Sequence, residues 1–491
     1  MIKIKISRRL IKASCVMLAV WLSLCVLSLN IGAVHTDTLT QEQTDTPLYG
    51  ADSFTPEMKR LYEDMVAMID EKIVKAGDLN GKIVELGGVA VTGDNGLRRV
   101  DGLVFYTRDY NVTYQEMVAV YTNMRYLHPE FYFLASTFLK ATDESALFPT
   151  VVESLSKKSA RQEIDRLIEN ECAVYDRALE SCEGSYEKAL AIHNLMVDRL
   201  DYAYDENGSP QSAYWAHSIV GAVKQMEGTC ETFAKWYAYQ LTRAGVGNYT
   251  VVGTSRGQGH AWNLVQMDDG NWYNIDVTWD NGSEYEGFGR NYTYFATPES
   301  VFNQTHTAND SMGSGFGYLY NLPRAEESYA YCPYLLNGQM PDMSDTQRAW
   351  QDYLAIWKRT LEKGELTVVL YVRNAEELQT LKAVTKDINK TASALRSMGF
   401  EDELDGKLTF YKSSLGDNLY KVRIEKEVLP EEEPKPTDPD KNGSTDEADV
   451  IYIMQFILGY KGTSGDNCDI NKDGRIDLRD AVVLLQSVRD Q

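Results

Sequence analysis

The chain has 491 residues, 43% hydrophobic and 25% charged, which is the composition of a globular protein with room for about three domains. Its 49 Lys and Arg stand against 72 Asp and Glu, so the formal net charge is −23 at pH 7. A chain this acidic repels phosphate backbones and anionic lipids, which argues against nucleic-acid binding and membrane-surface binding.

The first 33 residues have the pattern of a secretory signal peptide. Five basic residues lie within the first twelve, an apolar run covers residues 13–29, and the small residues Gly32 and Ala33 follow. We expect cleavage after Ala33, a secreted protein, and a polar spacer over residues 34–55. An uncleaved membrane anchor stays open as the alternative, because the run is close to the spanning minimum of about 17 residues.

Five cysteines lie beyond the predicted signal peptide: Cys172, Cys182, Cys230, Cys332 and Cys468. They are too few and too scattered for a disulfide framework, and the odd number leaves at least one thiol unpaired. A bond between Cys172 and Cys182 stays open, because nothing in the sequence requires it.

Residues 56–156 are predicted to form a small α/β domain. Within it, Lys82–Val91 and Gly102–Arg108 have the pattern of strands, and Tyr114–Leu127 that of a helix ended by His128-Pro129. Residues 160–200 are predicted to be helical. No reactive constellation is found before residue 200.

A second small domain with the order β-α-β-β is predicted over residues 345–426. Its elements are a strand at Glu365–Val372, a helix at Glu376–Met398, and a hairpin of Lys407–Tyr411 with Asn418–Lys426. The Pro- and Glu-rich residues 427–437 that follow are predicted to be an extended linker.

The C-terminal residues 438–491 contain an internal repeat, in which Asp438 recurs 31 residues later as Asp469. Each repeat places oxygen-bearing side chains at positions 1, 3, 5, 9 and 12 and glycine at position 6, which is the spacing of a calcium loop. The predicted ligands, with Ser444 and Arg475 acting through backbone carbonyls, are Asp438, Asp440, Asn442, Ser444, Asp446 and Asp449, and Asp469, Asn471, Asp473, Arg475, Asp477 and Asp480. A solvated acidic turn is the alternative, but two matching loops, each opening a matching amphipathic helix, favour two calcium ions.

Two departures from an EF-hand are informative: position 12 is Asp rather than Glu, and no helix precedes either loop. With its tandem loop-helix layout, the segment 438–491 closely resembles a type I dockerin. The resemblance implies an all-α module that calcium folds and that binds a cohesin module of an extracellular cellulosome scaffold. The residues at the positions that usually choose the cohesin differ between the repeats, and they are Glu447, Ala448, Leu478 and Arg479.

Three motifs in the middle of the chain carry candidate chemistry: Gly228-Thr229-Cys230, then GHAWN over residues 259–263, then WYNIDVTW over residues 272–279. Cys230 stands at the start of a predicted helix, Glu231–Arg243. A helix N-terminus stabilises a thiolate through its dipole and its free N–H groups, and these groups could also stabilise an oxyanion.

A hairpin is predicted from His260–Met267 and Asn271–Trp279, around the turn Asp268-Asp269-Gly270. In the register of a three-residue loop, Trp262 lies opposite Asp276, which places His260 diagonal to Asp276 on the same face. A lone cysteine or histidine is usually structural. The ordered combination nevertheless predicts an imidazole oriented by a carboxylate, with a thiol supplied by a packed helix.

This combination resembles the transglutaminase-like superfamily, over residues 160–335. The resemblance implies a papain-like core, and we therefore expect an α+β chain in which the two small α/β domains flank this core. It makes Cys230 the nucleophile, His260 the general base and acid, and Asp276 the orienting group, with no cofactor for catalysis. Gln225 lies near the place of an oxyanion-hole glutamine in papain-like enzymes. The expected reaction is acyl transfer at a peptide or protein carboxamide, preferably to water.

Two other classes of protein stay open. The chain could be a catalytically silent module that brings a partner to the scaffold, although the complete triad argues against this. It could also be a glycoside hydrolase or another accessory protein of polysaccharide degradation, but no convincing paired-carboxylate motif supports that class.

Overall fold

The computed structural model describes residues 54–86, 89–91, 95–281, 290–308, 322–400, 408–415, 419–426, 438–460, 462–465 and 467–489. The predicted signal peptide and linker lie outside these residues, as does the predicted spacer apart from Phe54 and Thr55. Over the described ranges, no helix is both long and apolar enough to cross a membrane. The chain divides into two compact units, one with residues up to 356, 369–383 and 412–423, the other with residues 357–368, 384–411 and 424–491.

The N-terminal region combines helices with short antiparallel strands. Its elements are α1 (Pro56–Ile69), η2 (Asp70–Val74), β1 (Glu85–Leu86), β2 (Val89–Ala90), β3 (Leu97–Arg99), β4 (Phe105–Tyr106), α2 (Thr107–Tyr110), α3 (Tyr114–Leu127), β5 (Leu134–Lys140), β6 (Ala146–Val152) and η4 (Glu153–Leu155). Strand β6 is buried along its whole length and pairs with β3, β4 and β5. The predicted helix α3 is confirmed to the residue, because Thr113 and Glu116 form a capping box at its start.

Two strands predicted in this region differ from the strands that the structure contains. Lys82–Val91 contains two short strands, β1 and β2, which pair antiparallel. The sequence between them is Gly-Gly, a pair that favours a reversal of the chain. Gly102–Arg108 yields only β4, because Gly102 has a left-handed φ of 77° and α2 begins at Thr107.

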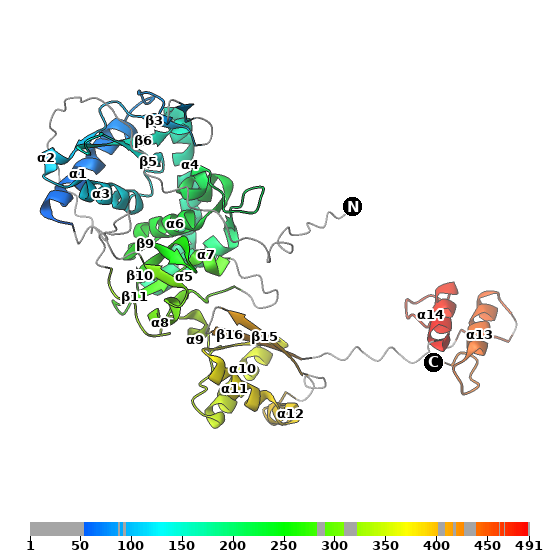
Figure 1. The fold of residues 1–491 in the computed structure, drawn as a ribbon. Coiled ribbons are helices and arrows are strands. Elements are labelled where there is room, and N and C mark those ends of the chain that lie inside the picture. The colour runs from blue at the N-terminus through cyan, green and yellow to red at the C-terminus, as the bar shows by residue number, and fades with distance from the viewer. Residues whose placement is uncertain are drawn as a thin grey trace. The chain divides into compact units, whose positions relative to one another are not determined.

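The middle of the chain places helices against an antiparallel sheet of five strands. Its elements are α4 (Lys158–Leu179), α5 (Ser185–Arg199), β7 (Asp201–Tyr202), η5 (Tyr214–His217), η6 (Gly221–Gln225), β8 (Glu227–Gly228), α6 (Cys230–Arg243), β9 (Asn248–Ser255), β10 (Gln258–Gln266), β11 (Trp272–Ile275), α7 (Val277–Asn281), β12 (Phe295–Thr297), α8 (Glu299–Phe302), β13 (His306–Ala308) and α9 (Pro333–Leu336). The strand order is β12-β11-β10-β9-β13. Helix α6 packs on β9 and β10 and also contacts α5 and α7 (Figure 1).

The predicted hairpin register is confirmed. Asn263 lies opposite Ile275 and Gln266 lies opposite Trp272, as the three-residue loop requires. The predicted strand Asn271–Trp279 is too long, however, because α7 begins at Val277. Asp276 accepts the Trp279 N–H through Oδ1 at 3.1 Å, a bond from an N-cap carboxylate that starts a helix rather than extending a strand.

The region after residue 345 contains the predicted β-α-β-β order with two corrections: a helix that was not predicted precedes the first strand, and the predicted helix is divided. Its elements are α10 (Thr346–Glu362), β14 (Thr367–Val372), α11 (Ala375–Thr385), α12 (Ile388–Ser397), β15 (Leu408–Leu415) and β16 (Leu419–Lys426), with strand order β14-β16-β15. The single predicted helix Glu376–Met398 is two helices. Asp387 interrupts it and caps α12 by accepting the Lys390 N–H at 3.0 Å.

The C-terminal segment consists of two loops, each followed by a helix: α13 (Glu447–Ile457) and α14 (Leu478–Arg489). The two helices pack together through Ile453 and Leu484, which are both fully buried. Cys468 is fully buried in the same small core.

Candidate active site

Cys230 is the first residue of α6, and the corner before it is held by hydrogen bonds. The hydroxyls of Thr229 and Thr232 both donate to the Ala216 carbonyl at 2.7 Å. A Cβ at Gly228 would lie 2.3 Å from the Cβ of Thr232, so only glycine allows β8 to pass this close to the helix. The sequence therefore fixes Cys230 at a helix N-terminus, where a thiolate is stabilised.

Exposure distinguishes Cys230 from most other cysteines. All five described cysteines are free, so the open Cys172–Cys182 bond is not formed. Cys172, Cys332 and Cys468 are buried, whereas Cys182 and Cys230 are partly exposed. Cys230 alone of these five combines partial exposure with a helix start and a neighbouring histidine.

His260 and Asp276 meet as the hairpin register predicts. The imidazole Nε2 of His260 lies 2.6 Å from Oδ2 of Asp276. Because an ionised carboxylate only accepts hydrogen bonds, Nε2 carries the proton that it shares with Asp276. Nδ1 is then the nitrogen left for Cys230, with which the His260 side chain also forms a hydrogen bond.

Burial and charge set the protonation of the His260–Asp276 pair. Burial disfavours a charged His260, but the charge of Asp276 and the interaction with Cys230 outweigh it and raise the pKa of His260 to about 10. Burial alone would raise the pKa of Asp276, yet His260 and His306 hold it well below its usual range. At neutral pH the site therefore contains an imidazolium beside a carboxylate, and the imidazolium can act as a general acid.

Aromatic rings surround the pair. The ring centroids of Trp262 and Trp279 lie 6.1 and 6.3 Å from that of His260, and the Arg256 guanidinium lies 4.6 Å from the centre of the Trp279 ring. The rings pack beside an imidazole whose side chain is only 8% exposed, and this burial strengthens the charge interactions within the pair.

His306 is a residue of this site that the sequence analysis missed. It begins β13, its side chain is fully buried, and its Nε2 lies 3.1 Å from the same Asp276 Oδ2 that His260 contacts. A lone histidine beyond α8 gives no local signal. It reaches the site only because β13 returns to pair with β9, with His306 opposite Ser255.

Tyr202 is the second missed residue. Strand β7 runs parallel to β8, with Tyr202 opposite Gly228, and the Tyr202 hydroxyl accepts the backbone N–H of Cys230. Burial, followed by the charges of Cys230 and Tyr204, raises the pKa of Tyr202, so the hydroxyl keeps its proton. The alternation of Tyr202 and Tyr204 after α5 could have indicated a strand, but not its pairing partner.

Gln225, predicted as an oxyanion donor, lies at the end of η6 with an exposed side chain. Met226, with a left-handed φ of 55°, turns the chain away before β8 begins. Among the described residues, Gln225 has no hydrogen bond to Cys230, His260 or Asp276. The donors beside the sulfur are the Cys230 N–H and the Tyr202 hydroxyl instead.

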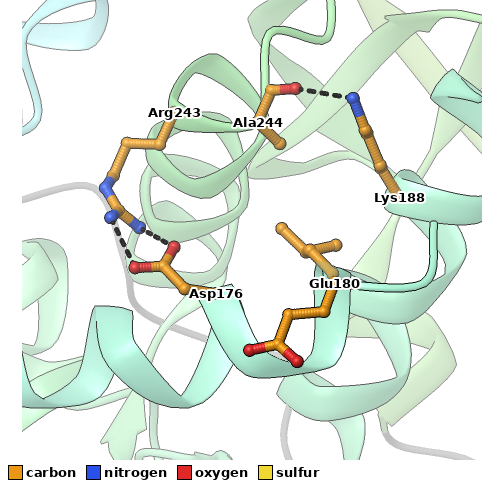
Figure 2. Close-up of a pocket in the computed structure, with 6 residues that line it drawn as sticks. Asp176, Glu180, Lys188, Arg243 and Ala244 are labelled. Atoms are coloured by element: carbon orange, nitrogen blue, oxygen red, sulfur yellow. Dashed lines mark hydrogen bonds and ion pairs between the residues drawn. The ribbon is translucent and has the colours of Figure 1, made fainter. Parts of the chain in front are cut away.

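A surface pocket lies at the opposite end of α6 (Figure 2). Arg243 pairs with Asp176 at 3.0 Å, and Lys188 donates to the Ala244 carbonyl at 3.2 Å. Cys230 and Arg243 are the two ends of a 14-residue helix, so they are about 20 Å apart. The pocket is therefore separate from the Cys-His-Asp site.

The two acidic loops have the same backbone conformation. Asp438 Oδ2 accepts the Gly443 N–H at 2.7 Å, and Asp469 Oδ2 accepts the Gly474 N–H at 3.0 Å. Both glycines have left-handed φ values, 91° and 81°. The glycine at position 6 therefore makes the same sharp turn in both repeats.

The last position of each loop is also equivalent. Asp449 and Asp480 are fully buried, and each accepts the N–H groups of the residues at positions 3 and 9 of its loop. Burial, together with the charges of Asp440 and Asp438, raises the pKa of Asp449 above its ordinary value. The first loop therefore concentrates negative charge that the neighbouring backbone N–H groups do not fully offset.

The carboxylates of these loops could hold a hard cation. Asp438, Asp440 and Asp449 each offer one oxygen, and the three oxygens lie within 4.8 Å of one another. In the second loop, Asp469 Oδ1 is buried and has no hydrogen-bond partner among the residues that the structure describes. An oxygen-only donor set with an unpartnered carboxylate oxygen fits calcium.

The remaining predicted positions also lie in the C-terminal segment. Glu447 and Ala448 begin α13, Leu478 and Arg479 begin α14, and all four are exposed. The other predicted ligands lie on the loops and are exposed or half-buried: Asn442, Ser444, Asp446, Asn471, Asp473, Arg475 and Asp477.

Comparisons with known proteins concern the middle of the chain. Residues 173–277 match the family model of the transglutaminase-like superfamily, so the chain carries a domain of this superfamily. The matched range contains Cys230, His260 and Asp276 and ends before His306. It supports a cysteine-dependent enzyme fold in this region.

Solved structures similar to the chain have low sequence identity. A TGase is 17% identical, covering 29% of this chain and 44% of its own, with a TM-score of 0.23. A candidate cysteine protease from Cytophaga hutchinsonii is 17% identical, covering 27% and 52%, with a TM-score of 0.19. A candidate protease from Parabacteroides distasonis is 10% identical, covering 28% and 33%, with a TM-score of 0.18. The chain spans about half or less of these proteins. No curated protein matches it.

Proposed function

We propose that this protein is a secreted cysteine-dependent enzyme that transfers the acyl group of a peptide or protein carboxamide, preferably to water. The observation that carries the proposal is the 2.6 Å contact between His260 and Asp276, next to a cysteine at a helix start. All three residues lie inside the transglutaminase-like range.

The geometry supports a two-step reaction. The Cys230 thiolate attacks the carbonyl carbon, and the C=O electrons move onto oxygen. The oxyanion then collapses, the C–N bond breaks, and His260 gives its Nδ1 proton to the departing nitrogen, which leaves a thioester. His260 next removes a proton from water, the resulting hydroxide attacks the thioester, and a carboxylic acid leaves as the thiolate is restored.

Two hydrogen-bond donors are placed for the oxyanion. The Cys230 N–H points at the Tyr202 hydroxyl, which keeps its own proton. A carbonyl oxygen that replaces the Tyr202 oxygen as the acceptor of this N–H can also accept the Tyr202 hydrogen. Two donors on the developing oxyanion stabilise the transition state, and the N–H leaves the Tyr202 oxygen to reach it.

Peptidase assays on the purified chain test this function. Peptides from a digested protein, or ammonia from glutamine-containing peptides, should be released by the wild type and not by a Cys230→Ala variant. An amine added to the assay should divert part of the thioester if transamidation also occurs. Equal release by the variant would overturn the proposal and favour the binding-module alternative.

Residues 438–491 are proposed to be a dockerin that binds two calcium ions and attaches the enzyme to a cohesin of an extracellular scaffold. Support comes from the equivalent loops, the unpartnered Asp469 Oδ1, and the exposed helix starts at Glu447 and Leu478. Calorimetry on the full chain should show two calcium sites, and Asp469→Ala should remove one. A full chain that binds no calcium would contradict this part of the proposal.

A further inference from the structure

The Asp276 carboxylate has more partners than a Cys-His-Asp triad uses. Oδ2 faces two imidazoles, His260 at 2.6 Å and His306 at 3.1 Å, while Oδ1 accepts the Trp279 N–H at 3.1 Å. We propose that His306 is a positioning residue that fixes Asp276 and, through it, the imidazole of His260. This inference rests on the proposed function.

The orientation of His306 follows from its two nitrogens. Nε2 faces a carboxylate, which can only accept, so Nε2 carries a hydrogen and donates to Asp276. Nδ1 lies 2.9 Å from the Thr305 hydroxyl. With both nitrogens engaged, the ring cannot flip without losing hydrogen bonds inside a fully buried site.

Packing holds the His306 ring in this orientation. Phe302 stacks on it with ring centroids 4.1 Å apart, and Trp262 meets it at 5.1 Å with its plane nearly perpendicular. The backbone is equally constrained, because a Cβ at Gly253 would lie 2.1 Å from the Thr307 carbonyl. Strand β13 therefore lies tightly against β9, and His306 has little freedom to move.

The hydrogen bond from His306 affects both the orientation and the charge of the Asp276 carboxylate. Two donors on one oxygen keep Oδ2 turned toward His260, and both favour the ionised carboxylate. Without His306, Oδ2 would keep only His260, and the buried carboxylate would take up a proton more readily. A protonated or rotated Asp276 would no longer hold His260 toward Cys230.

Other groups near Asp276 must be separated from the effect of His306. The titratable residues that face Asp276 from the packed elements are Tyr202 of β7, His260 of β10, Asp280 of α7 and Tyr294 before β12, while Cys230 of α6 faces His260. Since none of them changes when His306 is substituted, matched variants isolate its contribution.

A second buried pair provides the matched control. His193 Nε2 lies 3.1 Å from Asp280 Oδ2, the same distance as in the His306–Asp276 pair, and both side chains are fully buried. His193 has no cysteine partner in the described part of the chain. Replacing it should disturb packing to a similar degree without reaching the thiol.

The experiment measures iodoacetamide labelling of Cys230 in the full chain by mass spectrometry between pH 4 and 8. His306→Phe should slow labelling about tenfold at pH 5 and move the low-pH limb of the profile upward, because one hydrogen bond to a charged group is lost. His306→Gln keeps an N–H donor at a comparable reach, so it should restore most of the rate. His193→Phe should stay within about twofold of the wild type.

The outcomes separate this inference from the proposed function. A wild type that labels no faster than His260→Ala overturns the proposed function and this inference with it. If the wild type labels faster but a folded His306→Phe follows the wild-type profile, only the inference is wrong. Should His306→Phe fail to fold, His306→Gln is compared with His306→Asn, whose shorter amide does not reach Oδ2. Equal rates for these two would also overturn the inference.

Discussion

The Cys230 site and the two acidic loops both gather buried carboxylates, but they differ in how the charge is compensated. Asp276 receives hydrogen bonds from His260, His306 and a backbone N–H, all from the protein itself. In the second loop, Asp469 Oδ1 is buried without a hydrogen-bond partner in the described part of the chain. The comparison teaches that the first site is complete once the chain folds, whereas the second loop keeps a carboxylate oxygen that a cation could satisfy.

The largest expected effect is on the reactivity of the Cys230 thiol. A free cysteine is only about 0.3% thiolate at pH 6, given an ordinary pKa of about 8.5. Because the His260 imidazolium stabilises the thiolate, His260→Ala should slow iodoacetamide labelling of Cys230 at pH 6 by about 100-fold. The partly exposed Cys182 provides the internal reference. If Cys230 of the wild type were labelled only at the rate of Cys182, His260 would not be activating its thiol.

Removing calcium should act on the loops alone. Cys468 is fully buried between α13 and α14, so it should be protected in calcium and labelled at least about tenfold faster in excess chelator, when repelling carboxylates open the segment. Cys230 should label at the same rate in both buffers, and the buried Cys332 should stay protected. Protection of Cys468 in chelator would show that the loops need no cation.

Asp276→Asn should shift the basic limb of the pH profile of kcat/KM downward by about one to two pH units. The pKa of His260 is raised to about 10, so the imidazolium persists up to that pH and is lost above it. Without the Asp276 charge, His260 should lose its proton at lower pH, and the basic limb of kcat/KM should shift downward. Asp280→Asn, at the other buried pair, is the control and should move this limb much less, because Asp280 hydrogen-bonds His193 and not His260. If the basic limb of Asp276→Asn stayed at the wild-type pH, the charge of Asp276 would not be what keeps the proton on His260.

The smallest expected effect concerns Tyr202. Tyr202→Phe removes one neutral donor, while the Cys230 N–H stays, so acyl transfer should fall about tenfold or less. Iodoacetamide labelling of Cys230, which develops no oxyanion, should be unchanged. A fall in both rates would assign Tyr202 to thiol activation instead.

Much of the site follows from local sequence. The turn Asp268-Asp269-Gly270 determines the hairpin register, and the register brings His260 to Asp276. The repeated spacing of oxygen residues predicts two loops, and the structure shows that they have equivalent conformations.

The site residues that the sequence analysis missed depend on contacts between distant segments of the chain. Tyr202 and His306 reach the site through the pairs β7–β8 and β13–β9, which no local pattern specifies. The predicted strand Asn271–Trp279 extends beyond the end of β11 for a different reason. Asp276 caps α7, so a residue interpreted as part of a strand in fact starts a helix.

The position of β13 along the chain implies an order of assembly. Strands β9 and β10 are joined by the two-residue turn Arg256-Gly257, with φ of 49° and 77°, so this hairpin can form among near neighbours. Strand β13 must close a loop of 50 residues to set His306 opposite Ser255, and such distant pairing is slow. A chain that grows from its N-terminus therefore brings the thiol, imidazole and carboxylate together before the strand that steadies them arrives.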